Sequence, residues 1–195
     1  MLDYDYPFLL FKEWHQDVYK CAAITEPAAM ALATVNKEGI PAVRMVLLRH
    51  FDERGFVFYT NLLSRKGHDL QATQKAALCF YWMPLHKQVR IEGEVTLVAP
   101  EEADAYFATR PRGSQIGAWA SKQSSMLANP ALLTKRVDDF TEKFADKTIP
   151  RPSFWSGFRV IPHYFEFWQE GSYRLHTRRA FSKAENGWKE EYLYP

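Results

Sequence analysis

The spacing of hydrophobic residues changes once along the chain, shortly after its start. Between Phe8 and Ala22, apolar side chains recur at helical intervals, which predicts an amphipathic helix. The following sequence instead contains short runs rich in β-branched and aromatic residues, which are typical of strands. These runs cover residues 29–36, 42–51, 55–61, 76–83, 87–98, 158–168, 172–182 and 187–193.

The connections between the first three runs, "KEG" and "DERG", are short and contain glycine, so these runs are predicted to form an antiparallel meander. Further helices are predicted at residues 64–74, 100–110 and 129–146. Residues 111–125 show no clean periodicity. Because strands and helices do not alternate in βαβ order, the pattern favours an antiparallel β-barrel with flanking helices. We expect a single domain over residues 1–195, with the barrel and its helices in residues 27–195.

The composition suits one packed domain: 47% of the 195 residues are apolar and 15% are aromatic. The formal net charge of +2 gives no overall case for nucleic-acid binding, so anion binding must depend on local clusters. No stretch has the length of a membrane span, and the first residues lack the features of a secretory signal. Cys21 and Cys79 are far apart and are predicted to be buried, reduced thiols, which points to a cytoplasmic setting.

Basic residues occur at the start of the helix predicted at residue 64. Ser64 is its expected N-cap, and Arg65 and Lys66 follow in the first turn. A hydroxyl cap, free backbone N–H groups and two cations together suit a phosphate, and Arg44 on a neighbouring strand is expected to converge on it. The alternative is a solvated surface turn.

A second cluster lies at the end of the helix predicted over residues 100–110. Tyr106 and Arg110 are one helical turn apart, and Ser114 follows just beyond the helix. Two hydroxyls and a guanidinium around one point suit a second phosphate. The alternative is that Arg110 only complements the helix dipole.

The segment "EGSYRLHTRR" adds a third basic group. If it is a strand, Arg174, His176 and Arg178 share one face, and Leu175 and Thr177 share the other. Three potential cations on one face repel one another, so that face is expected to meet water or an anion. Leu175 is expected to face the core.

Other kinds of site have less support. There is no G-x-G-x-x-G or P-loop motif, and the histidines show no metal-ligand spacing, so no metal site is predicted. Gln88 and Arg90 share a strand face with Glu92 and Glu94, which is ordinary amphipathic alternation. Two possible phosphate sites in one barrel suggest a phosphorylated cofactor that meets a phosphorylated substrate.

Nine spaced segments resemble one known family. They are "RMVLLR", "FYTN", "SRK", "QVRIEG", "YFATRPRGSQIGAW", "SKQSS", "PSFWSGFRV", "EFWQ" and "RLHTR". In this order they are similar to pyridoxamine 5′-phosphate oxidases, from about residue 27 to the end. The resemblance implies a split β-barrel that works as a homodimer, with two FMN sites across the subunit interface.

The resemblance also implies roles for individual residues. Residues matching FMN contacts are Arg44, Met45, Val46, Leu47, Leu48, Tyr59, Thr60, Arg65, Lys66, Gln88, Gln123, Ser124, Trp168 and Arg178, of which Gln123 and Ser124 match contacts from the partner subunit. Residues matching substrate contacts are Arg49, Tyr106, Arg110, Ser114, Arg174 and His176, and the last two match residues that close over the substrate ring. Arg174 and His176 are therefore the catalytic candidates.

The implied reaction is FMN-dependent oxidation of pyridoxamine or pyridoxine 5′-phosphate to pyridoxal 5′-phosphate by dioxygen, with release of hydrogen peroxide. The alternatives are a non-catalytic flavin or pyridoxal phosphate binding protein, and a flavin oxidase of the same fold for a phenazine precursor. Three features depart from the family pattern. Arg49 stands where a lysine is usual, Thr177 stands where an aspartate is usual, and the start "MLDYDYPF" is short and acidic.

Overall fold

The structure is a computed structural model that describes residues 6–195, so most of the acidic start lies outside the described residues. The helices are α1 (Tyr6–Lys20), α2 (Arg65–Thr73), α3 (Pro100–Thr109), α4 (Arg112–Ala120) and α5 (Pro130–Lys143), with short 3₁₀ turns η1 (Met83–Leu85) and η2 (Ser172–Arg174). The strands are β1 (Ala29–Val35), β2 (Pro41–Leu47), β3 (His50–Asp52), β4 (Gly55–Asn61), β5 (Lys75–Trp82), β6 (Lys87–Leu97), β7 (Trp155–Gln169), β8 (Thr177–Ala184) and β9 (Gly187–Tyr192). The predicted mainly-β fold with flanking helices is confirmed.

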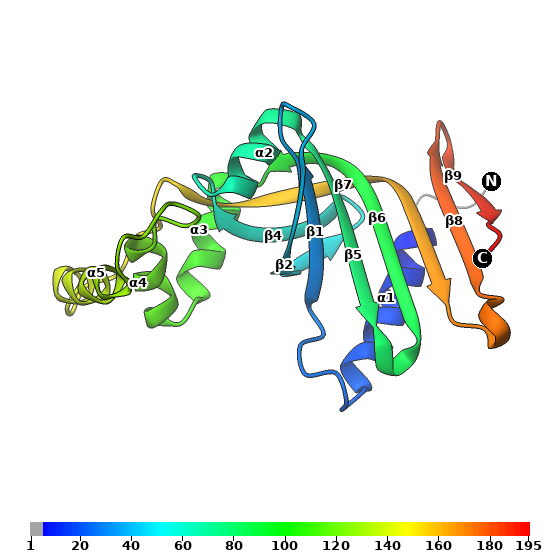
Figure 1. Cartoon of the computed structure of the whole chain (residues 1–195), viewed down its shortest axis with the longest axis horizontal. Coiled ribbons are helices and arrows are strands. Elements are labelled where there is room, and N and C mark those ends of the chain that lie inside the picture. The colour runs from blue at the N-terminus through cyan, green and yellow to red at the C-terminus, as the bar shows by residue number, and fades with distance from the viewer. Residues whose placement is uncertain (1–5) are drawn as a thin grey trace.

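All the strands belong to one antiparallel sheet in the order β2-β1-β5-β6-β7-β4-β3, and β8 and β9 extend it beside β7. Strand β7 is the longest and crosses the whole molecule (Figure 1). Its first half pairs with β4 and its second half with β8, while β6 lies along its other side. This one strand therefore connects the two ends of the protein.

The predicted meander is only partly correct. The two short hairpins, β1–β2 and β3–β4, are confirmed, but the run at residues 42–51 divides into two strands at opposite ends of the sheet order. At the division, the backbone N–H of Leu48 donates a hydrogen bond to the carbonyl oxygen of Ala28. The backbone N–H of Arg49 donates one to the carbonyl oxygen of Val57. Successive residues thus continue the β1–β2 and the β3–β4 ladders, so the chain passes here from one end of the sheet order to the other.

Aromatic side chains fill the barrel. Helix α1 packs its apolar face against the interior of the sheet, where the fully buried Phe11 meets Phe56 and Phe80 edge-on. Alternation along the strands explains this core, since Leu78 and Phe80 on β5 point inward while Ala77 and Cys79, which alternate with them, do not.

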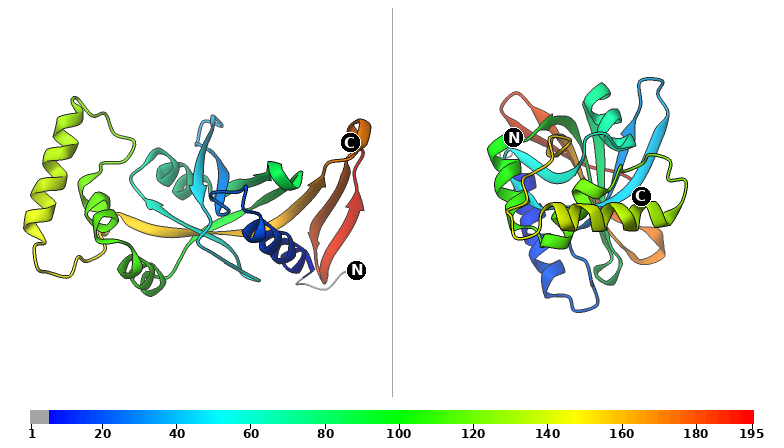
Figure 2. Two further views of the ribbon diagram at one scale, coloured as in Figure 1. Left: turned by 90° about the horizontal axis from the view of Figure 1, so that it is seen from below. Right: turned by 90° about the vertical axis from the view of Figure 1, so that its left-hand side faces the viewer.

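The helices α4 and α5 lie at one end of the molecule, and β8 and β9 lie at the other (Figure 2). Helix α4 occupies the segment without clean periodicity, whose first turns are polar and contain Gly113 and Gly117. The predicted helices α2, α3 and α5 are confirmed. No described helix has the length and apolar character needed to cross a bilayer.

The predicted strand at residues 172–182 begins five residues too early. Gln169 pairs directly with Thr177, so residues 170–176 form the turn that reverses the chain between β7 and β8. Arg174 and His176 therefore precede the strand and do not share a strand face with Arg178. The prediction for Leu175 is also wrong, because its side chain is 71% exposed.

The prediction that both cysteines are buried is only partly correct, because both side chains are partly exposed. Cys21 and Cys79 are free thiols of intermediate exposure. Cys79 lies on the outer face of β5, and its partial burial raises the pKa of its thiol.

Candidate functional site

A cavity of about 470 Å³ opens where the barrel meets helices α3 and α4. Strands β2 and β4 supply one wall, and the start of α2 and the turn after α4 supply another. The residues that line it are Met45, Val46, Leu47, Arg49, Tyr59, Thr60, Asn61, Lys66, Tyr106, Arg110, Ser114, Gly117, Ala118, Ser121, Gln123 and Trp155. Eleven of these were predicted from the sequence, so the structure gathers most of the candidates around one space.

The first cationic group in the cavity is Lys66, at the N-terminus of α2. Ser64 caps this helix as predicted, since its Oγ accepts a hydrogen bond from the backbone N–H of Gly67. The turn is tight, because a Cβ on Gly67 would stand 2.3 Å from the carbonyl oxygen of Leu62. Close packing thus fixes the helix start beside strand β4.

The Lys66 ammonium is held by neutral oxygens alone. Its Nζ donates to Oε1 of Gln123 at 2.8 Å, to Oγ of Ser64 at 3.1 Å and to Oγ1 of Thr60 at 3.3 Å. The residue is only 9% exposed, and burial together with the positive charge of Arg44 lowers the pKa of the ammonium. No carboxylate of residues 6–195 pairs with it, so a bound anion would relieve its desolvation.

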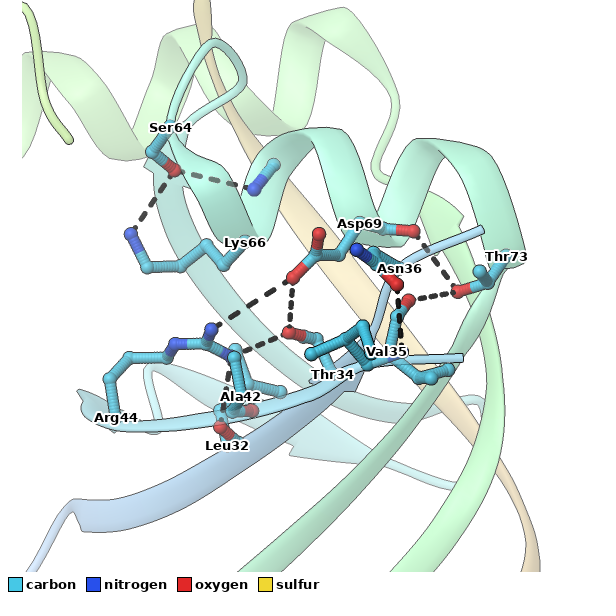
Figure 3. A network of polar contacts seen from close by, with 12 residues as sticks. Leu32, Thr34, Val35, Asn36, Ala42, Arg44, Ser64, Lys66, Asp69 and Thr73 are labelled. Carbon is cyan, nitrogen blue, oxygen red and sulfur yellow. Dashed lines mark hydrogen bonds and ion pairs between the residues drawn. The ribbon is translucent and has the colours of Figure 1, made fainter. Parts of the chain in front are cut away.

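Arg44 lies below Lys66 and is fixed by its own contacts (Figure 3). One of its terminal nitrogens donates to Oγ1 of Thr34 at 2.7 Å and to two backbone carbonyls, and the other lies 4.0 Å from the Asp69 carboxylate. Burial lowers the pKa of this guanidinium, Asp69 raises it and Arg65 lowers it. Arg44 and the exposed Arg65 therefore sit beside the Lys66 site but do not line the cavity.

The second cationic group is Arg110, which caps the end of α3. Its guanidinium carbon lies 4.7 Å from the ring centre of Trp155, and one terminal nitrogen is buried without a hydrogen-bond partner among the described residues. Burial lowers the pKa of this guanidinium, the Tyr106 hydroxyl raises it, and the nearby Arg49 lowers it. An orphaned N–H beside a second arginine is the arrangement expected for an anion-binding site.

Stacked aromatic rings form the wall beside Arg110. The rings of Tyr59 and Tyr106 are 4.0 Å apart at 15°, and those of Tyr59 and Trp155 are 5.3 Å apart at 8°. Burial, with smaller contributions from Glu102 and Tyr106, raises the pKa of Tyr59 to about 12, so its hydroxyl stays protonated. The wall is therefore apolar, rigid and neutral.

Four other candidates form a separate group at the far end of β7: Gln88, Trp168, His176 and Arg178. Gln88 pairs with Trp168, Trp168 pairs with Arg178, and the rings of Trp168 and His176 are 4.6 Å apart. None of these residues lines the cavity, which holds Trp155 at the near end of the same strand. At roughly 3.3 Å per residue, the strand carries Trp168 about 40 Å along from Trp155.

Three other candidates also lie outside the cavity. Leu48 belongs to the barrel core with 5% exposure, Arg174 is exposed in the β7–β8 turn, and Ser124 is exposed beside Gln123 with a positive φ of 69°. Gln123 lines the cavity of its own chain, where its Oε1 accepts hydrogen bonds from Lys66 and Thr60. Its expected contact with FMN from a partner subunit stays a prediction.

The cavity also contains residues that the sequence reasoning missed. These are Asn61, Gly117, Ala118, Ser121 and Trp155. Asn61 and Trp155 fall within the recognised segments "FYTN" and "PSFWSGFRV" but were not singled out. Gly117 and Ala118 lie on α4, the helix that the pattern did not predict.

An antiparallel sheet curved into a split barrel, with two uncompensated cationic groups in one cavity, defines the class: a split-barrel protein whose cavity fits phosphorylated ligands. A family model described as "Pyridoxamine 5′-phosphate oxidase" matches residues 20–144. A second, described as "Pyridoxine 5′-phosphate oxidase C-terminal dimerisation region", matches residues 155–195. The chain belongs to the pyridoxamine 5′-phosphate oxidase family, which confirms the resemblance.

Individual relatives agree with this assignment. The chain is 52% identical over 195 residues to a pyridoxine/pyridoxamine 5′-phosphate oxidase of Sinorhizobium fredii, covering 99% of this chain and 94% of the relative. It is 52% identical over 191 residues to the enzyme of that name from Brucella anthropi, covering 97% and 94%. Among solved structures, PhzG from Burkholderia lata 383, in complex with tetrahydrophenazine-1-carboxylic acid, matches with a TM-score of 0.91 and 31% identity over 100% of this chain and 98% of that one.

Proposed function

We propose that this chain is an FMN-dependent oxidase that converts pyridoxamine 5′-phosphate or pyridoxine 5′-phosphate to pyridoxal 5′-phosphate with dioxygen as acceptor. The observation that carries the proposal is the pair of cationic groups, around Lys66 and around Arg110, that share one cavity without a neutralising carboxylate among the described residues. Two such groups fit two phosphates, one on the cofactor and one on the substrate. The names of the 52% identical relatives support the same reaction.

The residues around Lys66 fit the phosphate of FMN. Ser64, Thr60 and the start of α2 surround the ammonium with hydroxyls and free N–H groups, and Arg44 adds positive charge from the adjacent strand. Arg110, Arg49, Tyr106 and Ser114 fit the substrate phosphate. FMN held there would supply a hydride acceptor for the substrate carbon that bears the amine or hydroxyl, and a route for the electrons to dioxygen.

The protein's own contribution is positioning. The stacked wall of Tyr59, Tyr106 and Trp155 excludes water from one side of the cavity. At the far end of β7, Nδ1 of His176 accepts a hydrogen bond from the backbone N–H of Gly171 at 3.3 Å. This contact leaves Nε2 as the ring nitrogen that would face the substrate.

Two copies of the chain are needed to complete this site. The group around Trp168 and Arg178 lies too far along β7 to reach the cavity of its own chain. In a two-fold dimer, each chain presents this group to the cavity of the other, because a contact from one chain to the other is repeated in reverse. The match to a region described as a dimerisation region supports this arrangement.

The outer face of the sheet is suited to that contact. Met45 on β2 is 64% exposed and pairs with Ala31, which pairs with Cys79 on β5. Met45, Ala31 and Cys79 are small or apolar. The same cross-strand row continues to two charged residues, Arg90 on β6 and Glu166 on β7. It therefore runs from the cavity wall at Met45 to the group that the partner must supply.

A cytoplasmic setting stays a prediction.

Oxygen uptake by the purified protein tests the proposal. Pyridoxine 5′-phosphate and pyridoxamine 5′-phosphate should each cause oxygen consumption with formation of peroxide and pyridoxal 5′-phosphate, whereas unphosphorylated pyridoxine should react poorly. A yellow protein that consumes no oxygen with either compound would be a flavin-binding protein without this activity. Oxidation of a reduced phenazine carboxylic acid in place of both vitamers would instead favour the kind of ligand bound to PhzG.

A further inference from the structure

A buried carboxylate links two arginines on the outer face of the sheet. Glu166 on β7 is 2% exposed and lies directly across from Arg90 on β6. Its Oε1 accepts a hydrogen bond from Nε of Arg178 at 2.8 Å, and its Oε2 accepts one from a terminal nitrogen of Arg90 at 2.9 Å. Each carboxylate oxygen therefore has one arginine partner.

These contacts leave Arg178 with a defined orientation. Its Nε is bonded to Glu166, and one terminal nitrogen donates to the carbonyl oxygen of Tyr194 at 2.9 Å. The hydrogen bond to Glu166 is the main cause of a raised pKa of the guanidinium. The second terminal nitrogen has no hydrogen-bond partner among the described residues, so it is free to meet a ligand.

We propose that Glu166 is a positioning residue for the cofactor, which holds Arg178 in the orientation that contacts FMN across the dimer. This inference rests on the proposed function, in which Arg178 is a cofactor contact. A free arginine side chain must lose rotamer freedom when it binds a ligand, and an arginine that is already fixed by a buried carboxylate loses less. Glu166 thus removes part of the ordering cost from FMN binding.

The same contact explains how the chain tolerates Thr177. The family usually has an aspartate at this position, next to the arginine that contacts FMN. Thr177 is exposed at the start of β8, whereas Glu166 on the adjacent strand β7 already supplies a carboxylate to Arg178. Loss of the aspartate therefore leaves Arg178 paired.

A double-mutant cycle tests the inference. Glu166→Gln keeps the size of the side chain but removes its charge, and it should raise the FMN dissociation constant of the full chain about tenfold, as expected for a charge-assisted contact. Arg178→Gln should raise it at least as much. Because Glu166 acts through Arg178, the double variant should bind FMN no more weakly than Arg178→Gln alone.

Glu92→Gln is the matched control, because Glu92 bonds to Arg90 at 2.8 Å but does not touch Arg178. It should leave the FMN dissociation constant unchanged, and thermal unfolding should be followed in every variant. If Glu166→Gln precipitates, Glu166→Asp, which draws the carboxylate back by one methylene, should weaken FMN binding in the same direction.

Two results would overturn the inference: Glu166→Gln lowers the unfolding temperature but leaves FMN affinity unchanged, or the losses from the two single variants add in the double variant. An unchanged affinity in Arg178→Gln would remove the cofactor role of Arg178 and this inference with it. The proposed reaction would still stand or fall by oxygen uptake with the phosphorylated vitamers, so the two failures can be told apart.

Discussion

At the scale of single residues, the most informative feature is a buried cation without a carboxylate partner. Lys66 is largely shielded from water, and its ammonium donates hydrogen bonds only to neutral oxygens. A desolvated ammonium of this kind lowers the stability of the empty protein and favours binding of an anion. Its position at a capped helix N-terminus makes phosphate the best-fitting partner.

Replacement of Lys66 by alanine should therefore weaken FMN binding by at least about tenfold, since charge-assisted bonds to phosphate contribute roughly 1.5–3 kcal/mol each. Riboflavin lacks the phosphate, so its affinity should be low in the wild type and nearly the same in Lys66→Ala. Titration of the two flavins by fluorescence measures both values. Lys75→Ala, at an exposed position on β5, is the control and should bind FMN normally. Equal FMN affinity in Lys66→Ala and the wild type would contradict the assignment.

The sequence predicted single residues well where a local rule was sufficient. Ser64 was recognised as a cap because the helix start has a local signature, and Tyr106 and Arg110 were placed together by helical spacing. Trp155 was missed because it reaches Arg110 through tertiary packing between β7 and the end of α3. No spacing rule links residues that are so far apart in the chain.

At the scale of elements, the turn between β7 and β8 is held in an unusual shape. Tyr173 and Arg174 have positive φ angles of 57° and 65°, which are costly for residues other than glycine. At the start of the turn, a Cβ on Gly171 would stand 2.1 Å from the carbonyl oxygen of Leu175. Strained backbone that is fixed by close packing is common at functional sites, and this turn carries both catalytic candidates.

Gly171→Ala should open this turn, because the new Cβ cannot share space with a backbone carbonyl. The displaced His176 and Arg174 should reduce kcat/KM for phosphorylated substrate by at least about tenfold, as misplaced contact residues do. The chain should still fold, because the turn lies outside the core. Steady-state kinetics beside thermal unfolding make the comparison.

Tyr173→Gly is the control on the same turn, since it relieves a positive φ and removes a side chain that is 95% exposed. It should keep activity. If Gly171→Ala had wild-type kinetics, the turn would not position the catalytic candidates.

The alternation in "SYRLHTRR" predicted a strand where the chain has to turn. Period-two patterning shows which side chains differ in polarity, but it does not show where a strand ends. The end was set by the pairing of Gln169 with Thr177, a tertiary contact. For the same reason the run at residues 42–51 was read as one strand, although its two parts form the strands at opposite ends of the sheet order.

At the scale of the whole molecule, the candidate site is divided between the two ends of β7. The outer face of β2, β1 and β5 is the surface that would join two copies, and Val43 lies on it with 70% exposure. A large exposed apolar side chain on an edge strand is a liability unless another surface covers it. Burial in a dimer interface would remove that liability.

Val43→Arg should therefore dissociate the dimer and weaken FMN binding with little change in the fold of each chain, because the position is exposed in the single chain. Sedimentation velocity and flavin titration measure the two effects. Leu9→Arg, on the outward side of α1 with 53% exposure, is the control and should remain dimeric. A wild-type chain that sediments as a monomer with FMN fully bound would exclude the shared site.

The division of the candidate site between the two ends of β7 was suggested by the family resemblance and could not be predicted from composition alone. Helical and strand periods place residues relative to their neighbours in one element, whereas the two groups lie at the ends of a strand and would meet only through the symmetry of the proposed dimer. The resemblance also expects Gln123 to contact the cofactor from the partner subunit, and this stays a prediction; within one chain, Gln123 accepts a hydrogen bond from Lys66.

The length of β7 has a genetic consequence. In the proposed dimer each chain contributes the cavity half of one site and the far half of the other. An allele damaged only near Lys66 and an allele damaged only near Arg178 would each be inactive alone. Expressed together, they would form mixed dimers in which one site combines both faults and the other combines two intact halves. Two recessive defects at opposite ends of a single strand would then complement each other.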